Sequence, residues 1–194
     1  MIDMLPPAGT ELLVGQKIRP LKRVEYDLLA ADGCFADERV ELLFGMVVEM
    51  PPLSPEHNAS VDHTFRWLDR QIGGRADVRC HGSYAATEDS EPQPDVFVIP
   101  KGDYRHAHPD RAFLVIEVAR TSIKRDRAKR ELYAAGHVDE YWIVNHDKRV
   151  VEVYREPIDG MWGKVSIHAV GETIAMLAFP DVQIAVGEIL PPIA

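Results

Sequence analysis

Two acidic residues embedded in apolar runs constrain the fold of this chain most. Asp95 lies within Pro94–Val98, and Glu117 lies within Leu114–Val118, 22 residues further along the chain. Both segments are rich in β-branched residues and are typical of buried strands. A carboxylate in a buried strand is costly unless another group pairs with it. The fold must therefore bring either a divalent metal ion or basic side chains to both acids.

The surrounding pattern predicts one α/β domain with a mixed sheet. The 194 residues fit a single domain, and no apolar run approaches the roughly 20 residues that a membrane span needs. Residues 111–119 are almost continuously apolar, the pattern of a central strand covered on both faces. A helix from Thr121 or Ser122 to about Ala135 and a strand over 138–144 follow. This strand–helix–strand unit should be parallel and right-handed.

The other expected elements flank this unit with helices and add β-strands at the C-terminal end. Residues 1–20 are rich in proline and glycine and are predicted to form an N-terminal arm, which leaves 21–194 as the domain. The expected elements are helices over 21–31 and 54–72, a hairpin or bulged strand over 39–50, and strands over 77–87, 94–99, 150–154, 163–170, 173–177 and 182–186.

Composition narrows the classes of function. The net charge of −9 argues against a dedicated nucleic-acid binder, which usually carries a basic patch. However, residues 120–131 hold six basic and two acidic residues and can present one basic edge to phosphates. Cys34 and Cys80 lack a Cys-x-x-Cys spacing and are expected to be free, packed thiols. No basic-then-apolar leader pattern is present, so a cytoplasmic location is expected.

The acids suggest metal chemistry. Mg²⁺ prefers carboxylate oxygens, so Asp95 and Glu117 could hold one ion; buried ion pairs are the alternative. Lys129 shares a helix face with Tyr133, and could stabilise negative charge in a transition state or simply be solvated. Glu41 could assist a metal or a water, or could face solvent on an edge strand.

Histidines give weaker signals. His57 lies in the first turn of the long helix and could point toward a substrate or act in the cap. His106 and His108 form a His-x-His pair that could bind zinc, although their polar surroundings favour a solvated loop. No glycine-rich phosphate-binding motif occurs, so no nucleotide cofactor is expected.

Six segments together resemble the Uma-type endonuclease family of the PD-(D/E)XK superfamily, in order and spacing, from about residue 21 to the end. They are RVELLFGMVVEM (39–50), SPEHN (54–58), QPDVFVIP (93–100), FLVIEVARTS (113–122), DRAKRELYAAGHVDEYWIVN (126–145) and RVVEVYRE (149–156). The resemblance implies a restriction-endonuclease-like α/β core.

The resemblance also assigns roles to single residues. It maps the aspartate of the superfamily onto Asp95 and the second acid onto Glu117. The helix lysine of the family falls on Lys129, its upstream acid on Glu41 and its helix tyrosine on Tyr133. One position departs from the superfamily pattern: Ala119 stands two residues after Glu117, where a lysine is usual. The lysine role then falls to Lys129, with Lys124 as the fallback.

Three functional hypotheses follow. The first is a metal-dependent DNA endonuclease, in which Asp95, Glu117 and the Val118 carbonyl bind Mg²⁺ or Mn²⁺. It would act as a homodimer, with Tyr154 and Trp162 as candidate contacts, and its phosphate contacts would come from Arg120, Arg125 and Arg127. The second is a catalytically weak or inactive protein of the same fold that acts as an interaction module. The third is a zinc hydrolase built on the histidine pair.

Overall fold

The computed structural model describes residues 15–119 and 122–190, and its centre is a six-stranded mixed sheet. The strand order is β3-β4-β5-β6-β7-β8, in which only β5 and β6 pair in parallel. The bounds are β3 (Asp77–Cys80), β4 (Val96–Ile99), β5 (Leu114–Ala119), β6 (Glu140–Asn145), β7 (Val150–Ile158) and β8 (Met161–Ala169). The predicted mixed sheet with a central strand at β5 is confirmed.

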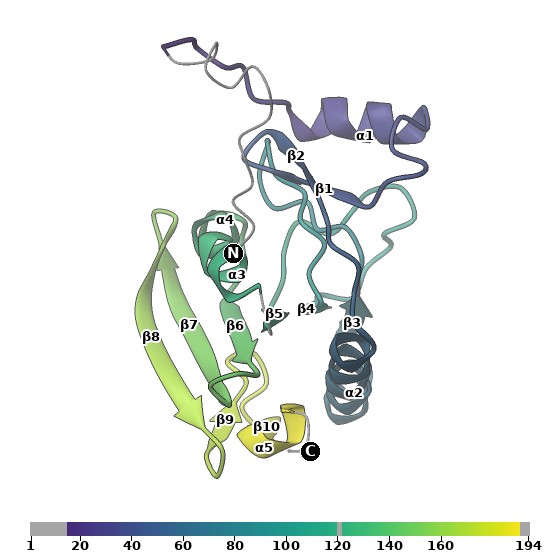
Figure 1. Cartoon of the computed structure of the whole chain (residues 1–194). Helices are drawn as coiled ribbons and strands as arrows, with labels where there is room; N and C mark the ends of the chain where they lie inside the picture. Colours follow the sequence, from purple (N-terminus) through teal and green to yellow (C-terminus); the bar gives the residue numbers. More distant parts are fainter. Residues whose placement is uncertain (1–14, 120–121, 191–194) are drawn as a thin grey trace.

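Helices cover both faces of this sheet (Figure 1). One face packs against α2 and the C-terminal elements, and the other packs against two short consecutive helices. The bounds are α2 (Pro55–Ile72), β9 (Thr173–Ala175), β10 (Gln183–Ala185) and α5 (Val186–Ile189) on the first face, and α3 (Ile123–Ala128) and α4 (Arg130–Ala135) on the second.

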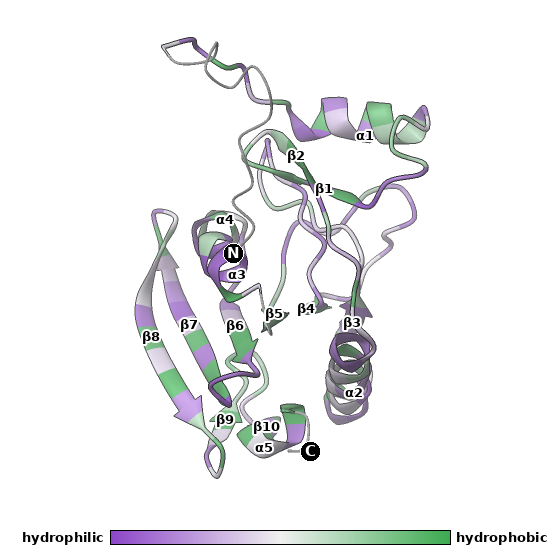
Figure 2. Ribbon diagram, viewed as in Figure 1, coloured by the Kyte–Doolittle hydropathy of each residue, from purple (hydrophilic) through white to green (hydrophobic). Residues whose placement is uncertain are grey.

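Strand periodicity decides which layer each side chain faces. On β5, Ile116 and Val118 join the core beneath α2, whereas Val115 and Ala119 join the core beneath α4. Successive strand residues point to opposite faces, so Glu117 points toward α3 and α4. Figure 2 shows hydrophobic and hydrophilic residues in alternation along β7 and β8.

Helix α2 begins and ends as the sequence predicts. The Ser54 hydroxyl accepts a hydrogen bond from the backbone N–H of His57 at 3.2 Å, and Pro55 occupies the first helical position. Gly73 ends the helix in the left-handed conformation. These caps fix the N-terminal turn of α2, which carries His57.

A hairpin and a helix form a separate unit beside the sheet. Strands β1 (Val40–Leu43) and β2 (Met46–Glu49) join through Phe44 and Gly45, which have φ values of 50° and 75°. Two positive φ values are typical of a type I′ turn. A Cβ at Gly45 would lie 2.1 Å from the Cβ of Pro20, so only glycine fits there. Helix α1 (Arg23–Ala31) packs on β1.

Several expectations are corrected. The helix expected through residue 135 is interrupted at Lys129, which ends α3 and precedes α4. Strand β3 ends at Cys80, because the next residue, His81, has a φ of 52°. Cys34 is exposed rather than packed. Tyr154 is buried within an aromatic cluster, so it offers no exposed contact to a partner.

Two expectations concern the N-terminal arm and the absence of a membrane span. Residues 1–14 of the expected arm lie outside the described residues. Across 15–119 and 122–190, no helix has the length and apolar character needed to cross a membrane.

Candidate active site

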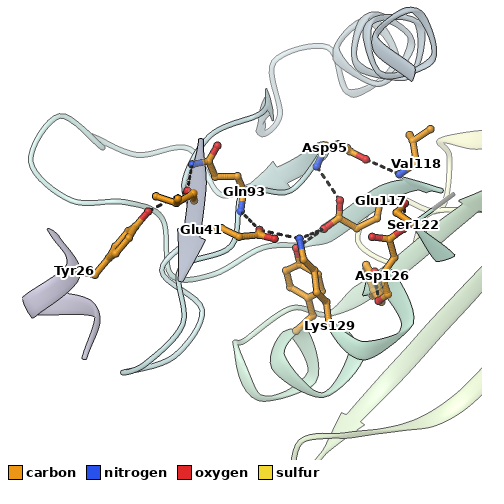
Figure 3. Close-up of polar contacts among 12 residues, drawn as sticks. Tyr26, Glu41, Gln93, Asp95, Glu117, Val118, Ser122, Asp126 and Lys129 are labelled. Atoms are coloured by element: carbon orange, nitrogen blue, oxygen red, sulfur yellow. Dashed lines mark hydrogen bonds and ion pairs between the residues drawn. The ribbon is translucent and has the colours of Figure 1, made fainter. Parts of the chain in front are cut away.

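Asp95 and Glu117 meet at the sheet edge that is formed by the ends of the inner strands β4 and β5 (Figure 3). Strands β4 and β5 are antiparallel, so the start of β4 lies beside the end of β5. The Asp95 backbone N–H donates to Glu117 Oε2 at 3.3 Å, and the Val118 N–H donates to Asp95 Oδ2 at 2.7 Å. The pairing of β4 with β5 ends at Val96 and Ile116, so the Asp95 carboxylate satisfies the next free N–H of β5, that of Val118.

Lys129 reaches the same place from the junction of α3 and α4. Its Nζ donates to Glu41 Oε2 at 2.9 Å and to Glu117 Oε1 at 3.2 Å. The Tyr133 hydroxyl, one turn later, donates to the same Glu117 oxygen at 2.8 Å. All four side chains are buried. The break between the helices thus places an ammonium group between two carboxylates in an environment of low dielectric.

Burial and mutual interactions perturb this network. Burial raises the pKa of Glu117 to about 8, although the Lys129 ammonium opposes the shift and the nearby Asp95 carboxylate adds to it. Burial disfavours the charge of Lys129, but Glu117 and Glu41 outweigh it and hold the Lys129 pKa above its usual range. Lys129 therefore remains a cation at neutral pH, whereas Glu117 takes up a proton readily.

Glu41 is fully buried on β1, so the solvent-facing alternative for this residue is wrong. Its Oε2 accepts from the backbone N–H of Gln93 at 3.2 Å as well as from Lys129. Its Oε1 is buried and has no hydrogen-bond partner among the described residues. An unsatisfied buried carboxylate oxygen is costly, and a cation or an ordered water would satisfy it.

His57 joins the edge from the first turn of α2. Its Nε2 lies 3.1 Å from Asp95 Oδ1. This hydrogen bond raises the pKa of His57, while partial burial opposes the shift. His57 is thus placed to orient the Asp95 carboxylate.

Asp126 is a buried acid near this network that the sequence analysis did not select. It lies on α3, accepts a hydrogen bond from the Ser122 hydroxyl at 2.5 Å, and has a pKa raised by burial. Its three-residue spacing from Lys129 was an available signal, because such residues share a helix face. The basic residues on either side of it made a solvated position look more natural.

The arginines predicted to contact phosphates are placed differently from one another. Arg127 is paired with Glu152, with Nε to Oε2 at 3.0 Å. Arg125 is half-buried, and its Nε has no hydrogen-bond partner within the described ranges. Arg120 lies outside the described residues. The fallback lysine, Lys124, is exposed.

The donor set at the sheet edge fits a hard divalent cation. Asp95 and Glu117 offer two carboxylates, which is the number that Mg²⁺ commonly takes from a protein while it keeps several waters. Glu41 Oε1, which has no hydrogen-bond partner in the described part of the chain, adds another carboxylate oxygen to the same network. We therefore regard the residues as compatible with Mg²⁺ or Mn²⁺.

The six-stranded mixed sheet with helices on both faces is a restriction-endonuclease-like fold. The chain matches the Uma2 family model, described as "Putative restriction endonuclease", over residues 24–187. It belongs to this family.

The comparison of structures agrees on the fold. The structure of this chain is similar to the crystal structure of a "putative nuclease belonging to DUF820" from Anabaena variabilis, with a TM-score of 0.73 and 15% sequence identity. The match covers 88% of this chain and 97% of that one. No curated protein matches this sequence.

Proposed function

We propose that this protein is a divalent-metal-dependent endonuclease that hydrolyses phosphodiester bonds in DNA. The observation that carries the proposal is the buried contact of Lys129 with Glu41 and Glu117, directly beside Asp95. A buried lysine that bridges two acids is costly to maintain as a purely structural device. Membership of the Uma2 family supports the same class of reaction.

Asp95 and Glu117, with the backbone carbonyl of Val118, are the proposed ligands of Mg²⁺ or Mn²⁺. When bound, such an ion polarises a phosphoryl oxygen and lowers the pKa of a coordinated water. The protein would fix the ligand positions beforehand. The Tyr133 hydroxyl holds the Glu117 carboxylate, and His57 and the Val118 N–H hold that of Asp95.

Lys129 is the proposed stabiliser of developing charge on the phosphate. Its ammonium remains protonated because two carboxylates surround it, and it is desolvated, which strengthens its interaction with an oxyanion. Glu41 would hold the ammonium in place and orient the attacking water. The exposed Lys124 lacks these contacts, so Lys129 is the better candidate of the two.

Duplex DNA would approach this edge past α3, and a homodimer would allow both strands to be cut. Arg125, whose Nε has no hydrogen-bond partner among the described residues, is better placed than Arg127 to bind a phosphate, because Arg127 already pairs with Glu152. Phosphate contacts release counterions and make binding steeply dependent on salt.

Nicking of supercoiled plasmid tests the proposal. Wild type is expected to nick with Mg²⁺ or Mn²⁺ and to stop on addition of EDTA, whereas Asp95→Asn and Lys129→Met should lose at least 100-fold in rate. Asp69→Asn, an exposed acid on α2, serves as the control and should cut as wild type does. Nicking by Asp95→Asn at the wild-type rate would refute the assignment. DNA binding with a steep salt dependence but no nicking would instead identify an inactive interaction module.

A further inference from the structure

Outside the proposed active site, we propose that Asp27, Glu91 and His108 form a second site for a divalent transition metal of the Zn²⁺ class. The three residues come from α1, from the segment that bridges to β1, and from the loop between β4 and β5. The bound ion fastens these three segments together.

The geometry of the three side chains supports a common ligand. One donor atom from each lies within 4.8 Å of the other two. His108 Nε2 is 3.7 Å from Glu91 Oε1. Ligand atoms on a tetrahedral zinc ion lie roughly 3.3–3.5 Å apart, given metal–ligand bonds of about 2.0–2.2 Å. Closure around an ion therefore needs shifts of no more than about 1.5 Å.

An independent observation points to a missing ligand at Glu91. This side chain is 3% exposed, yet its Oε2 has no hydrogen-bond partner in the part of the chain that the structure describes. Its backbone is held by reciprocal hydrogen bonds with Leu42, at 2.8 and 3.3 Å, so the side chain cannot easily turn to solvent. A buried carboxylate oxygen without a partner calls for a water or an ion.

The carboxyl groups of Glu91 and Asp27 lie close together, and burial together with the Asp27 carboxylate raises the pKa of Glu91 to about 7. Arg23 pairs with Asp27, with its Nη1 3.8 Å from Asp27 Oδ2, and its Nε donates to the Thr87 carbonyl at 3.3 Å. Arg105 lines the same pocket but pairs with Asp103, so among the ion pairs of the described residues it is Arg23 that offsets the charge of Asp27. A divalent cation would compensate the remaining charge.

The donors select the class of metal. An imidazole nitrogen with two carboxylate oxygens suits Zn²⁺ and its transition-metal neighbours, whereas Mg²⁺ favours oxygen ligands alone. The three residues open on a pocket of about 690 Å³, which leaves room for a water as a fourth ligand. His106 lines the same pocket but is not one of the three clustered residues.

The location of the site gives it a structural role. Glu91 pairs with Leu42, the residue after Glu41, and Gln93 donates from its backbone to Glu41 and from its side chain to the Val40 carbonyl. An ion at Glu91 thus stiffens the segment that holds Glu41, without touching the Asp95–Glu117 edge.

Zinc titration of the full-length, tag-free, EDTA-treated protein tests this inference. With excess Mg²⁺ present to occupy the Asp95–Glu117 edge, wild type is expected to bind one Zn²⁺ per chain by calorimetry and to gain thermal stability. His108→Ala and Asp27→Asn should each weaken binding by at least 10-fold. His106→Ala, in the same loop and pocket, is the matched control and should bind as wild type does.

Three results would overturn the second site. Equal zinc binding by His108→Ala and wild type would show an adventitious ion only. Equal loss in His106→Ala and His108→Ala would place the metal on the histidine pair instead. Loss of zinc binding in Asp95→Asn would place the zinc ion at the sheet edge. Circular dichroism of each variant checks that the fold is retained.

Discussion

Replacement of Lys129 by methionine isolates the charge that holds the proposed active site together. Methionine keeps most of the volume of the lysine stem but removes the ammonium that bridges Glu41 and Glu117. The two carboxylates then remain buried without their cation. We expect a large loss of stability that grows with pH.

The magnitude follows from the two ion-pair distances. At 2.9 and 3.2 Å and an effective dielectric constant of about 20, each pair contributes roughly 5–6 kcal/mol of Coulomb attraction when its carboxyl group is ionised, which for Glu117 holds above a pH of about 8. Desolvation of the ammonium offsets much of this sum. Removal of one partner from a buried pair costs about 3–5 kcal/mol, which is our expected decrease in the free energy of unfolding.

The pH dependence has a definite sign. The folded pKa of Glu117 is about 8 against an ordinary value of 4.5, so below pH 4.5 the group is protonated in both states. Between those values the unfolded chain releases a proton that the folded chain retains, and stability falls as pH rises. Loss of Lys129 raises the Glu117 pKa further, so the deficit of the variant should be larger at pH 9 than at pH 6.

Urea denaturation at both pH values measures this deficit. Lys124→Met, an exposed lysine on α3, is the control and should change the unfolding free energy by less than about 0.5 kcal/mol. If Lys129→Met cost no more than the control, or the same amount at pH 6 and pH 9, the buried network would be refuted.

Three further perturbations probe the same structure. Glu117→Gln cannot titrate, so the fall in unfolding free energy between pH 5 and 8 should flatten in urea titrations; an unchanged slope would contradict the raised pKa. Asp95→Asn replaces the charged acceptor that raises the His57 pKa with a neutral amide, so NMR titration should show that pKa fall, and no change would argue against the contact. Gly45→Ala places a Cβ 2.1 Å from the Cβ of Pro20 at a position with positive φ, whereas Gly171→Ala has positive φ but open space around it. Gly45→Ala should therefore lower the free energy of unfolding by about 1–3 kcal/mol more than Gly171→Ala. Equal losses would contradict the close approach of Pro20.

Much of the fold could be predicted because its signals are local. The caps at Ser54 and Gly73, the hairpin turn at Gly45 and the apolar run before Ala119 each depend on residues close in sequence. The mixed sheet then followed from the spacing of these elements. The boundary at Cys80 did not, because a positive φ at the next residue has no reliable sequence signal.

The site depends on contacts distant in sequence, and here the residues alone were less informative. Glu41 lies 88 residues from Lys129. The apolar residues beside Glu41 in the sequence therefore do not reveal that its side chain is buried against Lys129. The interruption of the helix at Lys129 and the burial of Asp126 are likewise tertiary effects. The sequence does predict Asp95 and Glu117 as site residues, because a carboxylate inside an apolar strand requires a partner.

The most direct test of the central claim is calorimetric titration of Mn²⁺ with plasmid nicking measured on the same samples. It compares His108→Ala, which removes the second metal site, with the same background carrying Asp95→Asn and Glu117→Gln. Our account predicts that the single variant binds Mn²⁺ and nicks DNA, and that the triple variant, still folded, does neither. Nicking that survives in the triple variant, or Mn²⁺ binding that is equal in both, would contradict it.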